Sequence, residues 1–321
     1  IEYEETHTYS VVSGSQVSRT STVTTISGAP QSSYTTDYAY TTDGEGRLDH
    51  VTYPTTVSAR PQFDYTYTYG YLDTVQQTEG STYPRYDLVS LDALGRETQV
   101  RLGGTALDVQ TLYDRVNGLV KEIKSGTPTL GTGTQNLAYT WDKVGNLKPR
   151  QDLNQGSAPN YRSEVFTYDA LNRLDTATLD GSPTQDLEYT TDGNISQKMM
   201  PDNATYFYTY NTAGKPHAVS TAGYSVGCTS WSDSYTYDTA GNMLTRTGSS
   251  GNRYVKWTAF SKPKKISVGS VDCGGDCTTF TYGPDRQLVK QVDKKGGVTR
   301  SIYYIGPHFE VEVSGSLTQY R

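Results

Sequence analysis

The sequence has little of what builds an ordinary globular core. Apolar residues make up 34 % of its 321 residues, against roughly 45–50 % in typical soluble domains. Cysteine, methionine and tryptophan occur three times each and phenylalanine six times, and no run of 18 apolar residues is present. A thick apolar core and a membrane-spanning helix are therefore both excluded.

The chain also has only a small excess of charge of one sign. The chain has 28 basic and 34 acidic residues, for a net charge of −6, and the sequence pI is about 5.3. The main basic cluster consists of Lys262, Lys264 and Lys265, and we interpret it as a solvated strand edge. Without a basic stripe, a nucleic-acid partner is excluded.

Motifs for catalysis or metal binding are missing. Residues 223–227 (GYSVG) match G-x-S-x-G, but the helical pattern that a nucleophile elbow needs does not follow. The four histidines stand far apart and outside any H-E-x-x-H motif: His7, His50, His217 and His308. We predict no catalytic residue, no metal site and no cofactor, and hence a protein that is not an enzyme.

Tyrosine, by contrast, is abundant, with 28 copies. In residues 234–248 (SYTYDTAGNMLTRTG), Tyr235 and Tyr237 alternate with a threonine, which places both rings on one face of a strand. Asp238 and Gly241 occupy the first and fourth positions of a type I turn, where Gly supplies a positive φ. The stretch predicts a β-hairpin with a tyrosine-faced strand and a bulge at the glycine.

The same pattern recurs along the chain. Copies or variants are found at residues 91–96 (LDALGR), 139–147 (YTWDKVGNL), 166–174 (FTYDALNRL), 189–194 (YTTDGN), 208–215 (YTYNTAGK) and 282–288 (YGPDRQL). Asn172 replaces Gly in one copy, and the Asp-Gly pair at 192–193 favours a two-residue type I′ turn. The predicted turn residues are Asp92, Gly95, Asp142, Gly145, Asp169, Asn172, Asp192, Asn211, Gly214, Asp238 and Gly241.

Residues 63–69 (FDYTYTY) carry an aromatic residue at every second position, so Tyr65, Tyr67 and Tyr69 are expected on one strand face. No window of 11 or more residues shows a helical period, and we predict an all-β chain. About eleven hairpins would make roughly 22 strands and a contour of about 100 Å. A sheet of that width is expected to curl or close.

The pattern Y-x-Y-D-x-x-G-[NR]-L resembles the YD repeats of bacterial Rhs proteins, Tc toxin subunits and animal teneurins. Residues 257–266 (WTAFSKPKKI) are similar to a W-T-x-F-x-x-P segment of Rhs-type chains, and residues 303–311 (YYIGPHFEV) to a Y-x-x-G-x-x-x-E segment. The resemblance covers residues 34–321. It implies that residues 1–321 are one array of antiparallel hairpins, a curved or spiral sheet belonging to a hollow shell, and a segment of a longer chain.

The resemblance implies a non-catalytic shell segment of a secreted or cell-surface protein. Its partners would be a polypeptide cargo or the remaining shell of the same parent protein. The alternative is a YD-repeat module that recognises carbohydrate or protein through aromatic faces, with Tyr65, Tyr67, Tyr69, Tyr235 and Tyr237 as the candidate residues. The D-P-x-G signature of self-cleaving Rhs chains is absent from residues 1–321, so neither autoproteolysis nor a toxin domain is assigned.

The three cysteines leave alternatives open. Cys273 and Cys277 flank Gly-Gly-Asp and could close a small ring over a turn, with Cys228 left over. A disulfide would indicate an oxidising compartment. Free thiols and, with only three thiols available, a zinc site are the other interpretations.

Overall fold

The computed structural model describes residues 3–24, 26–56, 59–78, 82–127, 133–158, 160–202, 204–226, 229–249 and 251–321. These residues form β-strands joined by turns, and no helix occurs among them, so none of them forms an apolar helix that could cross a membrane. The predicted all-β class is confirmed.

The described residues form 27 strands rather than the roughly 22 expected from the sequence. They are β1 (Glu5–Val12), β2 (Ser15–Val23), β3 (Tyr34–Tyr40), β4 (Leu48–Thr52), β5 (Gln62–Thr68), β6 (Tyr71–Gln77), β7 (Tyr83–Leu91), β8 (Glu97–Leu102), β9 (Leu107–Tyr113), β10 (Val120–Gly126), β11 (Gln135–Trp141), β12 (Leu147–Ser157), β13 (Asn160–Tyr168), β14 (Leu174–Leu179), β15 (Ser182–Tyr189), β16 (Ile195–Met199), β17 (Thr205–Thr209), β18 (Thr221–Val226), β19 (Thr229–Tyr237), β20 (Met243–Gly248), β21 (Arg253–Trp257), β22 (Pro263–Val268), β23 (Cys277–Tyr282), β24 (Leu288–Lys295), β25 (Val298–Tyr304), β26 (Glu310–Ser314) and β27 (Leu317–Tyr320).

The sheet is a simple meander. Each strand pairs antiparallel with the next one along the chain, from β1 to β27. Connections from an odd-numbered strand to the next even-numbered strand therefore share one edge of the sheet, which we call the turn rim. All the predicted Tyr-Asp turns lie on this rim, and the even-to-odd connections form the opposite rim.

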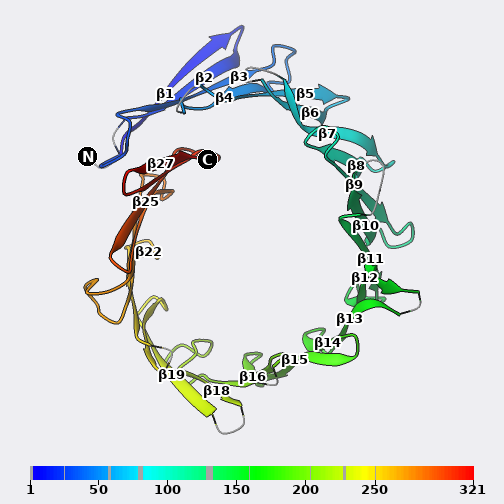
Figure 1. Cartoon of the computed structure of the whole chain (residues 1–321), viewed down its shortest axis with the longest axis vertical. Helices are drawn as coiled ribbons and strands as arrows, with labels where there is room; N and C mark the ends of the chain where they lie inside the picture. The colour runs from blue at the N-terminus through cyan, green and yellow to red at the C-terminus, as the bar shows by residue number, and fades with distance from the viewer. Residues whose placement is uncertain are drawn as a thin grey trace.

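The sheet curls into a ring whose two ends meet (Figure 1). At about 4.8 Å per strand, 27 strands give a contour of about 130 Å and a ring roughly 40 Å across. The N-terminal strands and the C-terminal strands lie against each other where the ring closes, with the two termini on the same side of the molecule. The predicted curved, spiral-like sheet is thus confirmed.

Packing of side chains between its ends closes the ring, and we call this cluster the closure core. Nine of the 17 buried hydrophobic residues in the described chain belong to it. They come from the segment that runs from the end of β2 to the residue after β4 and from the segment that runs from β25 to β26. They are Val23, Ile26, Tyr34, Val51, Tyr53, Tyr303, Ile305, Phe309 and Val311. Elsewhere the strands are mostly half-buried, as expected for a single-layer wall wetted on both faces.

Two hydrogen bonds to backbone carbonyls reinforce the closure. The Tyr303 hydroxyl donates to the Gly28 carbonyl at 2.5 Å, and the Lys290 ammonium donates to the Ser27 carbonyl at 2.5 Å. Both donors belong to the C-terminal part of the sheet and both acceptors to the connection between β2 and β3. The ring is therefore held by apolar burial together with polar contacts that fix its register.

Candidate functional site

The repeated turn is the local unit from which the ring is built. At residues 238–242, the Gly241 amide donates to the Asp238 carbonyl at 3.2 Å and the Asp238 amide donates to the Asn242 carbonyl at 2.9 Å. The Asp238 carboxylate accepts from the Asn242 amide at 2.8 Å and from its side chain at 2.9 Å. The register shifts between Thr236 and Tyr237, as expected for a type I turn followed by a bulge.

The same geometry recurs at three other predicted turns, which begin at Asp92, Asp142 and Asp169. The fourth residue of each has the positive φ that the turn chemistry predicts. Its values are 76° at Gly95, 91° at Gly145, 60° at Asn172 and 89° at Gly241, and Gly214 in a variant turn has 70°. Asn172 adopts this conformation because its short polar side chain tolerates the left-handed region.

The turn carboxylates are stabilised in the charged form. The Thr41 hydroxyl and then the Arg47 guanidinium lower the pKa of Asp43 to about 2. The Arg96 guanidinium lowers the pKa of Asp92, and the Asn242 side chain lowers the pKa of Asp238. Since the unfolded value is about 3.9, each carboxylate stabilises the fold above pH 4 and loses that contribution as the pH falls through its folded pKa.

We therefore expect stability to fall as the pH drops from about 4 to about 2. Urea midpoints measured between pH 6 and pH 2 should decline over this window. The variant Asp238→Asn, which keeps a hydrogen-bonding side chain at the turn but cannot titrate, should decline less steeply than the wild type. A flat wild-type profile, or equal slopes for both proteins, would contradict a role for the turn carboxylates.

The predicted type I′ turn at Asp192 is wrong. The Gly193 amide donates to the Thr190 carbonyl at 3.0 Å and the Thr190 amide donates to the Asn194 carbonyl at 2.8 Å, so Thr190 takes the first position and Asp192 the third. Of Asp192 and Gly193, Gly193 alone has a positive φ, of 83°, whereas type I′ requires two such residues. The Thr190 hydroxyl accepts from the Asn194 amide at 3.1 Å, as the aspartate does elsewhere.

The prediction that Asn211 begins a tight hairpin is also wrong. The turn lies one residue later, where the Lys215 amide donates to the Thr212 carbonyl at 3.0 Å. The return strand β18 starts at Thr221 instead of directly after Lys215. The Asn211 amide donates to the Ser220 hydroxyl at 3.0 Å, so this connection is a longer loop that reuses the repeat sequence.

Tyr69 does not belong to the predicted aromatic face. With Tyr69 at φ 51° and Gly70 at φ 86°, these residues form a two-residue turn between the paired Thr68 and Tyr71. The Tyr69 side chain is 97 % exposed at the tip of the hairpin. Tyr65, by contrast, packs against the closure core.

Two further repeat turns follow an aromatic residue without an aspartate at the first position. After Trp257, the Ser261 amide donates to the Thr258 carbonyl at 3.1 Å, with Ser261 at φ 58°. After Tyr282, the Arg286 amide donates to the Gly283 carbonyl at 3.0 Å, with Arg286 at φ 60°. The turn after Tyr282 lies within the predicted copy at residues 282–288. The aromatic residue directly before the turn is the signal that would also have located the turn after Trp257.

In seven hairpins, the aromatic residue directly before the turn links its hairpin to the one before it. A side-chain O–H or indole N–H donates to a backbone carbonyl near the start of the preceding hairpin's return strand. The bonds are Trp141 to Val120 (2.7 Å), Tyr168 to Leu147 (2.8 Å), Tyr189 to Leu174 (2.8 Å), Tyr210 to Ile195 (2.8 Å), Tyr237 to Val219 (2.7 Å), Trp257 to Met243 (2.8 Å) and Tyr282 to Pro263 (2.8 Å). We call this series the aromatic ladder.

The ladder is needed because neighbouring hairpins separate toward the turn rim. Within the hairpin of β13 and β14, pairing reaches Tyr168 and Leu174. Between hairpins, β12 and β13 pair no nearer to the rim than Pro149 and Val165. The Leu147 carbonyl lies beyond that last pair, and the Tyr168 hydroxyl supplies the donor that the strand ladder no longer provides. The repeated tyrosine thus holds the sheet together where the backbone does not.

Removing one ladder hydroxyl should destabilise the protein measurably. Tyr168→Phe leaves the Leu147 carbonyl, at the half-buried interface, without its 2.8 Å donor, and we expect a loss of about 1–2 kcal/mol in the free energy of unfolding. The matched control is Tyr69→Phe, at a hydroxyl on a fully exposed ring. Chemical denaturation of both variants checks this, and equal stability of the two would show that the ladder is not structural.

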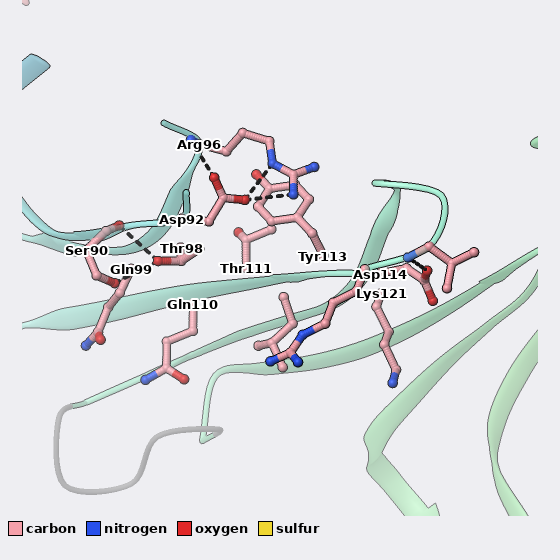
Figure 2. Close-up of a pocket in the computed structure, with 13 residues that line it drawn as sticks. Ser90, Asp92, Arg96, Thr98, Gln99, Gln110, Thr111, Tyr113, Asp114 and Lys121 are labelled. Carbon is pink, nitrogen blue, oxygen red and sulfur yellow. Dashed lines mark hydrogen bonds and ion pairs between the residues drawn. The ribbon is translucent and has the colours of Figure 1, made fainter. Parts of the chain in front are cut away.

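A basic residue at the fifth turn position adds a second link between hairpins. The Arg96 guanidinium pairs with the Asp92 carboxylate at 2.7 Å and lies over the Tyr113 ring of the next hairpin, 3.8 Å from its centroid (Figure 2). Arg173 repeats the arrangement with Asp169 and with the Tyr189 ring at 4.1 Å. Cation–π contact of this kind stabilises by about 0.5–1 kcal/mol at exposed sites.

Figure 2 shows the groove that opens where two hairpins separate. β8 and β9 pair up to Gln99 and Gln110, and beyond that point the groove is lined by side chains that include Ser90, Thr98 and Thr111. Its lining is largely hydroxyl, amide and charged, and contains neither histidine nor cysteine. Such a set can form hydrogen bonds but offers no activated nucleophile.

Of the three interpretations of the cysteines, the structure agrees with the disulfide. Cys273 and Cys277 are joined by a disulfide with a Cα–Cα distance of 5.4 Å, on the opposite rim between β22 and β23. Cys228 lies outside the described residues. The described residues contain no group of three or more His, Cys, Asp or Glu side chains placed to hold a metal ion. Residues 223–226 of the G-x-S-x-G match lie within strand β18, which is not the strand-to-helix turn of a nucleophile elbow.

Comparison with known proteins identifies solved structures with a similar fold. The chain aligns over 97 % of its length with a chain of the Photorhabdus luminescens Tc holotoxin pore, with a TM-score of 0.67 and 16 % identity, and covers 17 % of that chain. It aligns over 96 % with a chain of the TcdB2-TccC3 crystal structure, with a TM-score of 0.66 and 17 % identity, again covering 17 % of that chain. No family model and no curated protein matches the sequence.

At this level of identity the likeness concerns the fold, and the chain spans about a sixth of the length of those it matches. The match extends over nearly all of this chain. The chain, a curved antiparallel sheet of Tyr-Asp hairpins, therefore has the fold found in these Tc toxin chains, which confirms the predicted resemblance at the level of the fold.

Proposed function

We propose that the protein is a non-catalytic wall segment of a shell that encloses or presents a polypeptide cargo. The observation that carries this proposal is the closed ring, whose ends are held together by the closure core. A flat binding module has no need to bury nine side chains where its two ends meet. The likeness to chains of the Tc holotoxin supports the same function.

The size of the ring favours an extended or helical cargo. A ring roughly 40 Å across with a wall about 10 Å thick leaves roughly 30 Å inside. A folded domain of about 100 residues, with a radius of gyration near 13 Å, would fill or exceed that space. A helix about 10–12 Å in diameter, or an unfolded chain, would fit.

The alternative, recognition of carbohydrate or protein through an aromatic face, has less support. Carbohydrate binding of that kind needs exposed rings, whereas Tyr65 packs against the closure core and Tyr237 is engaged in the aromatic ladder. Tyr69, the most exposed tyrosine of the described residues, lies at a hairpin tip and not on the face of the sheet. The tyrosines are thus used to build the wall.

We further infer that the protein is secreted or displayed at a cell surface. The disulfide between Cys273 and Cys277 is of the kind that persists in oxidising compartments. The remaining shell of a parent protein would then be exported with it.

The test is binding of an unfolded polypeptide. Fluorescently labelled, reduced and carboxymethylated α-lactalbumin should bind the ring, whereas the native labelled protein should not. Opening the ring with Val311→Asp should abolish binding, because the interior is lost. Equal binding to the closed and opened rings would place the site on the outer surface, and no binding at micromolar concentration would contradict the proposal.

A further inference from the structure

The most exposed large apolar side chains of the described residues are not scattered. Five of them are at least 70 % exposed, and the next, Val11 and Val298, reach 60 %. The five are Tyr69 (97 %), Leu94 (77 %), Val116 (96 %), Val144 (70 %) and Leu171 (71 %). Each lies at the tip of a turn-rim hairpin, and the five hairpins, from β5–β6 to β13–β14, are consecutive along the chain. We call them the apolar tips.

The turn geometry explains their exposure but not their apolar character. In the turns that begin at Asp92, Asp142 and Asp169, the tip is the third residue, a position whose side chain the fold does not require to be apolar. Farther along the rim the same position holds Asp192 and Ala240. Phe260, at the third position of its turn, is half-buried and packs edge-on against the Tyr282 ring. The apolar tips therefore occupy one arc of the rim and leave the rest without them.

The spacing and curvature of the arc limit what can cover it. Successive hairpins are about 10 Å apart, so five tips span about 40 Å. On a ring about 40 Å across, an arc of that length departs from a straight line by about 8 Å. A straight helix could therefore contact two or three tips but not all five. The turn rim of a second copy of this chain has the same spacing between tips and the same curvature, so it could contact all five.

The charged residues between the tips also favour self-association. The Asp92 carboxylate is paired with Arg96 at 2.7 Å, and the Asp169 carboxylate with Arg173 at 2.6 Å. At the turns that begin at Asp114 and Asp142, a basic residue, Arg115 or Lys143, directly follows the aspartate. The arc therefore carries no large excess of charge of one sign, and two copies of it can approach each other.

We propose that the apolar tips form an interface with a second copy of this chain, so that two rings stack turn rim to turn rim. A two-fold axis through the β9–β10 tip sets Val116 opposite its own counterpart. It sets Leu94 opposite Val144, and Tyr69 opposite Leu171. Such an isologous contact uses all five tips and closes the assembly at two copies.

The expected affinity is modest. A strip about 40 Å long and roughly 12 Å wide covers about 500 Å² per copy, below the roughly 800 Å² per partner of standard interfaces. We therefore expect a dimer that forms in the micromolar range, with a wall twice the height of one ring.

Sedimentation equilibrium from about 1 to 100 μM tests the proposal. The wild type should shift from monomer to dimer over this range. Val116→Glu places two carboxylates at the two-fold axis and should raise the dimer Kd at least tenfold. Ala240→Glu, at a tip outside the arc, is the matched control and should dimerise as the wild type does. A wild type that stays monomeric, or a dimer that is insensitive to Val116→Glu, would overturn the proposal.

Cysteine crosslinking tests the symmetry in a Cys228→Ser background. Val116→Cys should form a covalent dimer on oxidation, and Ala240→Cys should not. Leu94→Cys should crosslink when mixed with Val144→Cys and poorly with itself. Circular dichroism verifies that each variant is folded. Efficient crosslinking through Ala240→Cys, or equal crosslinking of all pairs, would show that the rings do not meet through this arc.

Discussion

Val311→Asp is expected to open the ring without unfolding the sheet. Val311 has no exposed surface and belongs to the closure core. An unpaired carboxylate at that position costs several kcal/mol, and separating the two ends of the sheet lets water reach it. The strand pairs elsewhere do not depend on closure, since each strand bonds to its sequence neighbours. Small-angle scattering should therefore show a larger radius of gyration while the far-UV spectrum stays that of a β-protein.

The control for this experiment is Val298→Asp. Val298 lies on β25, close to the same end of the sheet, but is 60 % exposed, so the charge remains hydrated and the scattering profile should not change. Global unfolding of Val311→Asp would show that closure and hairpin pairing form one cooperative unit. An unchanged radius of gyration at a neutral pH would show that the closure core tolerates a charge.

The hairpins could be predicted from the sequence because their determinants are local. A type I turn with a bulge depends on four or five consecutive residues, as at Asp238 and Gly241, and the structure repeats it at Asp142 and Asp169. The strand count was underestimated because turns such as Ser13-Gly14 carry no Tyr-Asp signal. With φ of 52° and 85°, they reverse the chain in two residues.

The closure core could not be predicted, because nothing local marks it. Tyr34 and Tyr303 are buried in the same cluster although they are far apart in the sequence. Their local patterns resemble those of half-buried wall tyrosines such as Tyr235. Which tyrosines become fully buried depends on where the curled sheet meets itself, and that depends on the summed curvature of all the hairpins.

The wrong turn type predicted at Asp192 and the missed turn after Trp257 have one cause. The sequence motif did not include the contacts of the aromatic ladder. The sequence motif was centred on the aspartate, but the aspartate is replaceable by threonine or glycine at the first position, as Thr190 and Gly283 show. What recurs at these turns is an aromatic donor directly before the turn, because its acceptor lies on the neighbouring hairpin. A contact between two repeats is harder to recognise in the sequence of a single repeat than a contact within that repeat.

Gly241→Val is expected to destabilise its hairpin by about 2 kcal/mol. The position has φ 89°, a left-handed conformation that a β-branched residue reaches only with strain. A Cβ added at Gly241 would meet no atom within 4 Å, so the cost comes from the backbone conformation and not from a clash. Gly241→Asn is the matched control and should cost far less, because Asn172 already holds the equivalent position at φ 60°.

The effect should remain local, because neighbouring hairpins keep β19 and β20 in register through their own strand pairs. Hydrogen exchange should show faster exchange at residues 235–246 in the Val variant, with the other hairpins protected as in the wild type. Since the Tyr237 hydroxyl bonds to the Val219 carbonyl at 2.7 Å, loosening the turn should also expose the β17–β18 connection. Equal protection of residues 235–246 in the Val and Asn variants would show that the turn does not organise the repeat.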